Sequence, residues 1–269
     1  MRISILTPSY NQGKFIEKTI TSVMNQNWQD VEHIIIDGGS TDNTIDILKR
    51  YPHLRWISEP DEGQADALNK GLEVATGEII GWINSDDYYE TNIFEDVVSY
   101  CRDIKVKWII GNITFHYTTQ QVKIPCVSPD ITYAHLLRNP DIVRQQGTFF
   151  RKELLKEVGG WGKDFYMVMD YDLWVRIAKK YQPKMVNKNF AYFAWHTEQK
   201  SSPKNMIRQA REINQILKDN KVPLIKRLPV LSKKYYYLVK SILKDRLIAT
   251  GFISEKYSSM PMSAIKNKK

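Results

Sequence analysis

The first hundred residues alternate between short runs rich in β-branched residues and stretches in which apolar residues recur with helical spacing. Clusters of glycine, asparagine, aspartate and serine separate the two kinds of segment. The runs predicted to be strands are residues 3–7, 31–37, 54–59 and 78–84. Repeated βα units of this kind predict an α/β fold, in which a mostly parallel central sheet has helices on both faces.

Polar turns follow three of the predicted strands, at residues 9–11, 37–39 and 84–86. In open parallel sheets, ligands bind beyond the carboxyl ends of the strands. We therefore expect these three polar turns to converge at one rim of the sheet and to form a ligand site.

The pattern changes after about residue 105. Residues 107–115 and 121–124 read as a hairpin, and residues 147–150 and 185–194 as further strands, so antiparallel additions to the sheet are expected. Helical spacing of apolar residues predicts helices over residues 93–101, 131–137, 152–158, 171–180 and 203–218.

The excess of positive charge lies in the tail of the chain. Of 269 residues, 39 are lysine or arginine and 30 are aspartate or glutamate; residues 1–220 have a net charge of −1 and residues 221–269 of +10. A near-neutral body argues against a nucleic-acid-binding protein. No nucleic-acid partner is therefore expected.

The tail combines its basic residues with an apolar helical stripe, beyond a boundary marked by Pro223 and Pro229. The stripe consists of Tyr235, Leu238, Val239, Ile242, Leu243 and Leu247, flanked by Lys233, Lys234, Lys240, Lys244 and Arg246. A basic amphipathic helix with tyrosines can lie on an anionic membrane surface. The alternative is that the stripe packs on the body and the lysines face water.

Neither a membrane-spanning run of about 18 apolar residues nor a signal peptide is recognisable in the sequence. The expected location is the cytoplasm, with peripheral attachment to the inner face of the cell membrane through the tail. Cys101 and Cys126 have neither metal-binding nor redox spacing, so no redox chemistry is expected.

The segment Asn84-Ser85-Asp86-Asp87 places oxygen-bearing side chains at a strand end. The glycine motifs of dinucleotide-binding and P-loop proteins are absent, so a different means of binding phosphate is expected. A hard divalent cation held by such oxygens can bridge diphosphate oxygens. An ordinary capping turn is the alternative interpretation of this segment taken alone.

Five segments occur in a fixed order: TPSYN after the first strand, IIIDGGSTDNT at the second, DEGQADALNKG after the third, GWINSDDYY at the fourth, and MDYDLWVR about eighty residues later. This set resembles glycosyltransferase family 2, whose members have the GT-A fold with a Rossmann-like sheet and move a sugar from a nucleotide diphosphate donor. The resemblance covers residues 1 to about 200. It implies a catalytic domain at 1–220, with a nucleotide-sugar half (1–105) and an acceptor half (106–220), followed by the tail at 221–269.

The resemblance assigns several residues to the nucleotide. Asp37 matches the aspartate that accepts a hydrogen bond from the base, which favours UDP. Thr7, Pro8 and Tyr10 match the turn that flanks the base and ribose. Asn84 and Ser85, in the segment that corresponds to the family's D-x-D motif, are also expected to bind the nucleotide.

For the metal, the resemblance makes Asp86 the direct ligand of Mg²⁺ or Mn²⁺. Asn84 departs from the family pattern, which has aspartate there, but it can still supply a carbonyl oxygen to the metal or bind the ribose. His196 resembles a late histidine that many GT-A enzymes use on the metal or diphosphate. Asp87 is expected to be structural.

For catalysis, Asp170 matches the family's general base, which removes the proton of the acceptor hydroxyl, although Met169 replaces the usual neighbouring glutamate. Asp172 is the rival candidate, and both aspartates can also be first-turn helix charges. Arg144, Gln145 and Gln146 match a segment that lines the acceptor pocket. Residues expected to contact the donor or acceptor sugar are Gln64, Asp66, Gln146, Trp161 and Asp172; helix capping is the alternative for Asp66.

The resemblance thus implies an inverting, metal-dependent glycosyltransferase that moves a hexose or related sugar from a UDP-sugar to a carbohydrate acceptor. A lipid-linked acceptor in the assembly of cell-envelope polysaccharide is the expected setting. The alternatives are a nucleotidyltransferase acting on a sugar phosphate and a catalytically inactive protein that binds sugar nucleotides.

Overall fold

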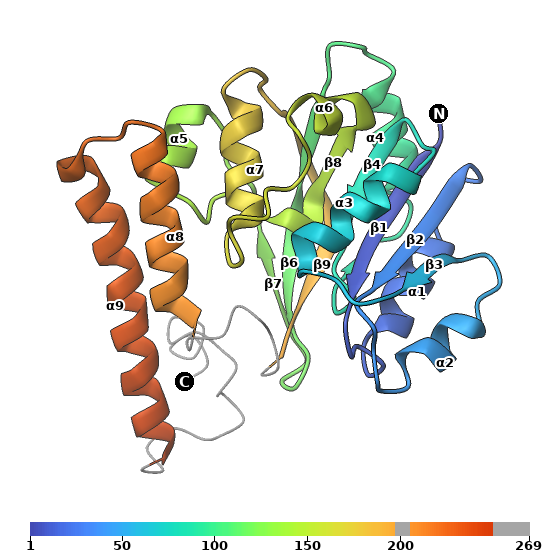
Figure 1. Cartoon of the computed structure of the whole chain (residues 1–269), viewed down its shortest axis with the longest axis horizontal. Helices are drawn as coiled ribbons and strands as arrows, with labels where there is room; N and C mark the ends of the chain where they lie inside the picture. Colours follow the sequence, from blue (N-terminus) through green and yellow to red (C-terminus); the bar gives the residue numbers. More distant parts are fainter. Residues whose placement is uncertain (197–204, 250–269) are drawn as a thin grey trace.

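The computed structural model describes residues 1–196 and 205–249, with side chains up to residue 243 except that of residue 241. In this part of the chain, one nine-stranded sheet is flanked by helices on both faces, and two long helices lie side by side at one end (Figure 1). The predicted α/β class, with helices covering both faces of a central sheet, is confirmed.

Ten elements make up the first half and the start of the second. They are β1 (Ile3–Ser9), α1 (Ile16–Met24), β2 (Val31–Asp37), α2 (Thr44–Lys49), β3 (Arg55–Ser58), α3 (Gln64–Val74), β4 (Ile79–Trp82), β5 (Tyr88–Tyr89), α4 (Phe94–Cys101) and β6 (Trp108–Tyr117). The remaining elements are β7 (Val122–Cys126), α5 (Tyr133–Arg138), the 3₁₀ turn η1 (Gln145–Gly147), β8 (Thr148–Arg151), α6 (Lys152–Glu157), α7 (Met169–Ala178), β9 (Lys184–Trp195), α8 (Met206–Asp219) and α9 (Leu224–Ala249).

The strand order is β3-β2-β1-β4-β8-β6-β9-β5, with β7 paired to β6. The first four strands are parallel, and their register places Ser9 beside Asp37 at the carboxyl ends of β1 and β2. The strands β8 and β7 are antiparallel to their neighbours, as predicted, whereas β9 runs parallel to β6. The polar turns after β1 and β4 therefore open at the same rim.

Alternating side chains of each strand pack on opposite faces of the sheet. In β4, Ile80 and Trp82 join the apolar cluster formed with α3, α6 and α7, whereas Ile79 joins the cluster formed with α4. This two-residue period makes both faces of the strand apolar, which is the pattern of a buried parallel strand.

One strand was not predicted from the sequence. The strand β5 is only two residues long and follows the polar turn after β4 directly, so it lacks a periodic pattern of its own. It pairs antiparallel with β9 and brings the end of β9 against the turn after β4. This pairing positions two segments of the site that are a hundred residues apart in sequence.

The tail helix α9 packs against α8 and α5 through a narrow contact. Among the α9 side chains that the structure describes, Val230 and Lys234 are buried. Lys234 Nζ lies 2.6 Å from Asp141 Oδ1 and 3.1 Å from Gln209 Oε1. The exposed large apolar residues of α9 are Leu224, Ile225, Leu228, Tyr235, Tyr236, Tyr237, Val239, Ile242 and Leu243. The predicted stripe therefore faces outward at most of its positions, while the side chains of Lys244, Arg246 and Leu247 lie outside the described residues.

Candidate active site

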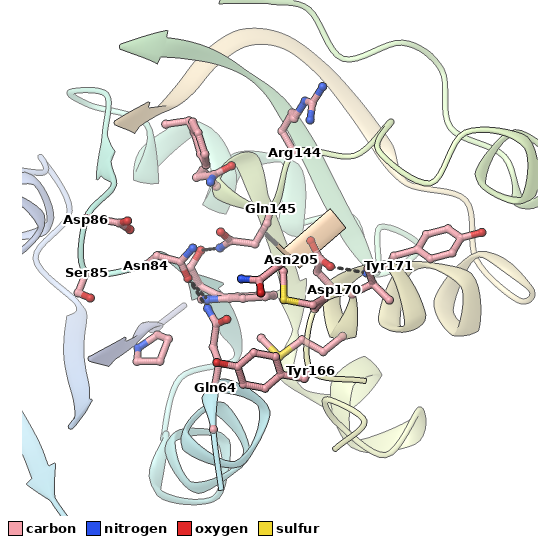
Figure 2. Close-up of a pocket in the computed structure, with 18 of the residues that line it drawn as sticks. Gln64, Asn84, Ser85, Asp86, Arg144, Gln145, Tyr166, Asp170, Tyr171 and Asn205 are labelled. Atoms are coloured by element: carbon pink, nitrogen blue, oxygen red, sulfur yellow. Dashed lines mark hydrogen bonds between the residues drawn. The ribbon is translucent and has the colours of Figure 1, made fainter. Parts of the chain in front are cut away.

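A cavity of about 670 Å³ opens at the carboxyl ends of β1 and β4. Its wall comes from the turn after β1, the start of α3, the turn after β4, the η1 segment, the start of α7 and the end of β9. Figure 2 shows Asp86 and Asp170 on different sides of this cavity, with Asn84 and Gln145 between them. Its volume lies within the range of about 300–1,000 Å³ that small-molecule sites occupy.

Asp86 and His196 meet at one end of the cavity. Asp86 follows β4 and His196 follows β9, and His196 Nε2 lies 3.0 Å from Asp86 Oδ2. The ring of Phe15 stacks on the imidazole, with the ring centroids 4.2 Å apart. The stacked Phe15 ring limits tilting of the imidazole and so helps to keep it beside Asp86.

Asp87 joins the segments that surround this pair. It is almost completely buried; its carboxylate accepts hydrogen bonds from the Gln146 side chain (2.8 Å) and from the backbone N–H of Ala194 (2.9 Å). Burial raises the pKa of Asp87, and the charge of Asp86 raises the pKa further. The expected structural role of Asp87 agrees with these contacts, which link the turn after β4 to η1 and β9.

Asn84 lines the cavity, but its carbonyl oxygen is already occupied. The indole N–H of Trp82 donates to Asn84 Oδ1 at 3.0 Å, and Gln64 Nε2 donates to the same oxygen at 2.7 Å. An indole nitrogen is always a donor, so the side-chain atom of Asn84 that faces it must be the oxygen. Both hydrogen bonds draw the Asn84 carbonyl toward Trp82 and Gln64, whereas the contact of Asn84 with a nucleotide stays a prediction.

Asp170 lies in the first turn of α7 and lines the cavity. Its Oδ1 atom accepts a hydrogen bond from the backbone N–H of Tyr171 at 2.8 Å. The rival candidate, Asp172, does not line the cavity; its Oδ2 atom pairs with the Arg176 guanidinium at 2.8 Å. Because residues two apart on a helix project in different directions, only the first aspartate reaches the cavity.

Two of the three residues predicted to flank the base line the cavity. Pro8 and Tyr10 do so, and Tyr10 is 60% exposed, which leaves its ring free to contact a ligand; Ser85 also lines the wall. Thr7 is fully buried and its hydroxyl lies 2.9 Å from His33 Nε2 on the neighbouring strand β2. Thr7 therefore does not reach the cavity in this structure, because side chains alternate between the two faces of a strand and this one is buried against His33.

Asp37 stands at the end of β2 but is 0% exposed. Its Oδ2 atom accepts hydrogen bonds from the backbone N–H groups of Gly39 (3.1 Å) and Ser40 (2.8 Å) and from the hydroxyl of Ser58 (2.7 Å). The positive φ of Gly39 (83°) lets the loop fold back over the carboxylate. In this structure Asp37 therefore holds its own loop and does not line the cavity, and its contact with the base stays a prediction.

The residues predicted to contact a sugar divide into two groups. Gln64 and Gln146 line the cavity, where Gln64 donates to Asn84 and Gln146 donates to Asp87. Asp66 points to the other side of α3, where it pairs with Lys163 and Lys70 and accepts a hydrogen bond from the backbone N–H of Glu62. These contacts agree with the capping alternative for Asp66 and correct the sugar-contact expectation for both Asp66 and Asp172.

Trp161 belongs to the core. It is 1% exposed, and its ring meets the Trp82 ring edge-on at a centroid distance of 5.6 Å. The expected stacking of Trp161 on a sugar is therefore wrong for this structure. A tryptophan beside a Gly-Gly turn is often exposed, but here both backbone polar groups of Trp161 bond the Asn69 side chain of α3 and the ring lies in the core.

Several residues that line the cavity were not predicted from the sequence. They include Asp61, Phe115, Asp141, Tyr166, Phe193, Asn205 and Gln209. Phe115 and Phe193 belong to strands whose alternating aromatic residues could have indicated a wall. No local signal marks Asp141 or Gln209, which reach the cavity only because α5, α8 and α9 pack together.

The donor set at Asp86 fits a divalent cation. A carboxylate oxygen and an imidazole nitrogen lie side by side there, and His196 Nδ1 is buried with no hydrogen-bond partner among the described residues. Mn²⁺ accepts both ligand types, and Mg²⁺ binds through one or two carboxylates plus phosphate oxygens and water. Within residues 1–196 and 205–249, no three acidic, histidine or cysteine side chains form a complete ligand set.

Comparison with known proteins places this site in a family context. The sequence profile of glycosyl transferase family 2 matches residues 4–159, more than half of the chain. The chain is 28% identical over 187 residues to an uncharacterized glycosyltransferase of Mycobacterium tuberculosis (strain H37Rv), covering 67% of this chain and 70% of the relative. It is 34% identical over 102 residues to the uncharacterized glycosyltransferase YibD of Escherichia coli (strain K12), covering 36% of this chain and only 30% of that relative.

Two solved structures share the fold. S. aureus TarS 1–349 in complex with UDP has a TM-score of 0.62 at 19% identity, with 80% of this chain and 65% of that chain covered. The mannosyltransferase PcManGT from Pyrobaculum calidifontis, in complex with GDP-Man and Mn²⁺, has a TM-score of 0.60 at 19% identity, with 96% of this chain and 83% of that chain covered.

Proposed function

Because this chain belongs to glycosyltransferase family 2 and is a glycosyltransferase, we propose that it transfers a hexose or related sugar from a UDP-sugar to a carbohydrate acceptor, with inversion at the anomeric carbon and with a divalent cation. A lipid-linked glycan in the assembly of cell-envelope polysaccharide is the proposed acceptor. The catalytic domain is proposed to span residues 1–220, and the tail residues 221–269.

One observation supports this proposal most directly. Asp86, His196 and Asp170 come from three distant segments of the chain, and all three line one cavity at the carboxyl ends of β1 and β4. Sugar transfer from a nucleotide diphosphate needs a group that can hold a cation and a group that can accept a proton. The carboxylate beside an imidazole at one end of the cavity suits the first role, and the second carboxylate suits the other.

Asp170 is proposed to be the general base. Inverting transfer requires that the acceptor hydroxyl lose its proton as it attacks the anomeric carbon from the face opposite the leaving diphosphate. A carboxylate on the acceptor side can take this proton directly. The hydrogen bond from Tyr171 N–H holds Asp170 Oδ1 in place, so the orientation of the carboxylate is set by the first turn of α7.

Asp86 and His196 are proposed to hold the divalent cation. When bound, such a cation offsets the charge that builds up on the departing diphosphate. Asp87 supports this end of the cavity through its hydrogen bonds to Gln146 and Ala194, which hold the turn after β4 against η1 and β9. Tyr10 and Pro8 lie at the rim, where the nucleoside is proposed to bind.

The choice of UDP is tested with a panel of UDP-, GDP- and dTDP-sugars, each added with Mn²⁺ or Mg²⁺. We expect UDP-sugars to raise the melting temperature most, by roughly 5–10 °C at a concentration of about 100 Kd, because a ligand that binds only the folded state stabilises it by about 2.7 kcal/mol. We also expect slow, metal-dependent release of UDP. Stabilisation by GDP-sugars alone would show that the donor assignment is wrong, and tight UDP binding without UDP release from any donor would favour the inactive binding protein.

The tail is proposed to attach the enzyme to an anionic membrane surface. The apolar residues of α9 from Tyr235 to Leu243 are largely exposed rather than packed on the body, and Lys233 and Lys240 are exposed beside them. No helix in the described part of the chain is long and apolar enough to cross a bilayer. An exposed face that is both apolar and basic suits the surface of an anionic bilayer.

Vesicle flotation tests this attachment. The full chain is expected to float with vesicles that contain anionic lipid and much less with zwitterionic vesicles. The double substitution Lys233→Gln, Lys240→Gln is expected to weaken binding by roughly 2 kcal/mol, or about 30-fold, since each basic residue near the surface contributes about 1 kcal/mol. Equal flotation of the wild type and this variant, or no flotation of either, would contradict the proposal.

A further inference from the structure

The cavity is lined by acidic side chains and by one strongly basic residue. Asp61, Asp86, Asp141 and Asp170 line its wall, whereas Arg144 is the only lysine or arginine in the wall among the described residues. Two of these carboxylates already have partners: Asp141 pairs with the Lys234 ammonium, and Asp86 lies beside the His196 imidazole. The positive charge of Arg144 has no such partner: no carboxylate of the described residues lies within salt-bridge distance of it.

Arg144 is held in a fixed place by its neighbours. The two residues that follow it are buried and anchored, Gln145 to the backbone carbonyl of Trp82 (2.5 Å) and Gln146 to the Asp87 carboxylate (2.8 Å). The guanidinium carbon lies 5.3 Å from the centroid of the Phe115 ring, and Arg144 Nε is buried without a hydrogen-bond partner among the described residues. The charge is therefore positioned and partly shielded from water, but it is not neutralised by the protein.

The surroundings of Arg144 are aromatic. Phe115 meets Phe193 edge-on at a centroid distance of 5.6 Å, and Phe193 lies 5.5 Å from Trp195; all three rings line the cavity. Aromatic faces of this kind can pack against a sugar ring. Aromatic rings do not fully offset the free-energy cost of shielding a guanidinium charge from water. The partner that would offset this cost is an anionic oxygen, and this part of the wall does not supply one.

Arg144 lies in the part of the chain, residues 106–220, that is proposed to bind the acceptor. Arg144 precedes η1, in the half of the chain after residue 105, and Figure 2 shows its guanidinium pointing away from both Asp86 and Asp170 in that view. The diphosphate of the donor is proposed to bind at Asp86 and His196. An anion that reaches Arg144 would therefore belong to the acceptor.

We infer that the acceptor is anionic and that Arg144 binds its negatively charged group, a carboxylate on a sugar or a phosphate, while the aromatic wall packs against the adjoining ring or chain. This inference rests on the proposed function, since it names the acceptor class of the same site. The planar fork of the guanidinium matches the paired oxygens of either group.

Matched neutral and anionic probes test the inference on the full chain with UDP and Mn²⁺ present. The sugar-carboxylate pair is 4-nitrophenyl β-D-glucuronide against 4-nitrophenyl β-D-glucoside, and the phosphate arm is decyl phosphate against decanol. Binding is measured by ligand-observed NMR. We expect the wild type to bind the anionic member of at least one pair about tenfold more tightly, and the responding pair identifies the anion as carboxylate or phosphate.

Three variants complete the experiment. Arg144→Gln is expected to reduce the preference to about twofold or less, and Arg144→Lys to leave part of it, because the charge remains but the two-pronged contact is lost. Arg138→Gln, which removes the same charge from the exposed end of α5, is the control and should keep the full preference. UDP affinity, measured in parallel, should stay within about twofold in all three.

The inference is overturned if the wild type shows no preference for either anion, if Arg144→Gln keeps the preference, or if Arg144→Gln weakens UDP as much as it weakens the anionic probe. The last result would assign the guanidinium to the donor diphosphate. Failure of the wild type to bind UDP would instead contradict the proposed function, so the two failures are distinguishable.

Discussion

Asp170→Asn is expected to lower kcat by a factor of about 10² to 10⁴ and to leave UDP affinity within about twofold of the wild type. An asparagine keeps the size of the side chain and can still accept the hydrogen bond from Tyr171 N–H, but it cannot take a proton from the acceptor hydroxyl. The variant should therefore fold and bind the donor while transfer stops.

The matched control is Asp172→Asn, two residues further along the same helix. Its carboxylate pairs with Arg176 outside the cavity, so this change should leave kcat within a fewfold of the wild type. Transfer is measured as UDP release in the presence of acceptor, and UDP affinity by calorimetry. If Asp172→Asn abolished transfer and Asp170→Asn did not, the base would be the rival aspartate.

Asp86→Ala is expected to remove the metal-dependent part of UDP binding. In the wild type, Mn²⁺ should tighten UDP binding by a large factor relative to chelator. In the variant, this factor should fall at least about 100-fold, equivalent to about 2.7 kcal/mol, because the carboxylate is one of only two proposed protein ligands. The remaining ligand, His196, would hold the cation poorly without a negative charge beside it.

The comparison for this variant is Asp46→Ala, which removes a carboxylate that is 80% exposed on α2 and does not line the cavity. It should bind UDP with the wild-type dependence on Mn²⁺. Calorimetric titration of both variants, with Mn²⁺ and with chelator, separates a ligand role from a general effect of charge. A full Mn²⁺ effect in Asp86→Ala would place the cation elsewhere.

The fold could be predicted because its signals are local. The strands β1, β2 and β4 are short apolar runs that end in polar turns, and parallel strands bring their carboxyl ends to the same rim. Asp86 and Asp170 could be named for the same reason: each belongs to a short motif whose order along the chain follows the order of the elements. The two-residue strand β5 had no such signal, because two residues show no period.

Which of the predicted site residues face the cavity and which are bonded elsewhere could not be predicted, because this depends on partners that are distant in sequence. The carbonyl of Asn84 is occupied by Trp82 and Gln64, and Asp66 pairs with Lys163 nearly a hundred residues later. Trp161 is buried only because α3 and the core close over it. Sequence motifs indicate which side chains stand at a rim, but not which of their atoms are already bonded.

For this protein, the sequence by itself determined the α/β architecture and the family, and it predicted two carboxylates, Asp86 and Asp170, that line one cavity. Hydrophobic periodicity and ordered turns are properties of neighbouring residues, so they can be recognised without the tertiary structure. Only the tertiary structure decided that Asp37 and Thr7 are closed off, that Asp172 faces Arg176, and that Arg144 stands in the cavity wall with its charge uncompensated by the described residues. Burial and hydrogen-bond occupancy arise from contacts between distant segments, and these exist only once the chain has folded.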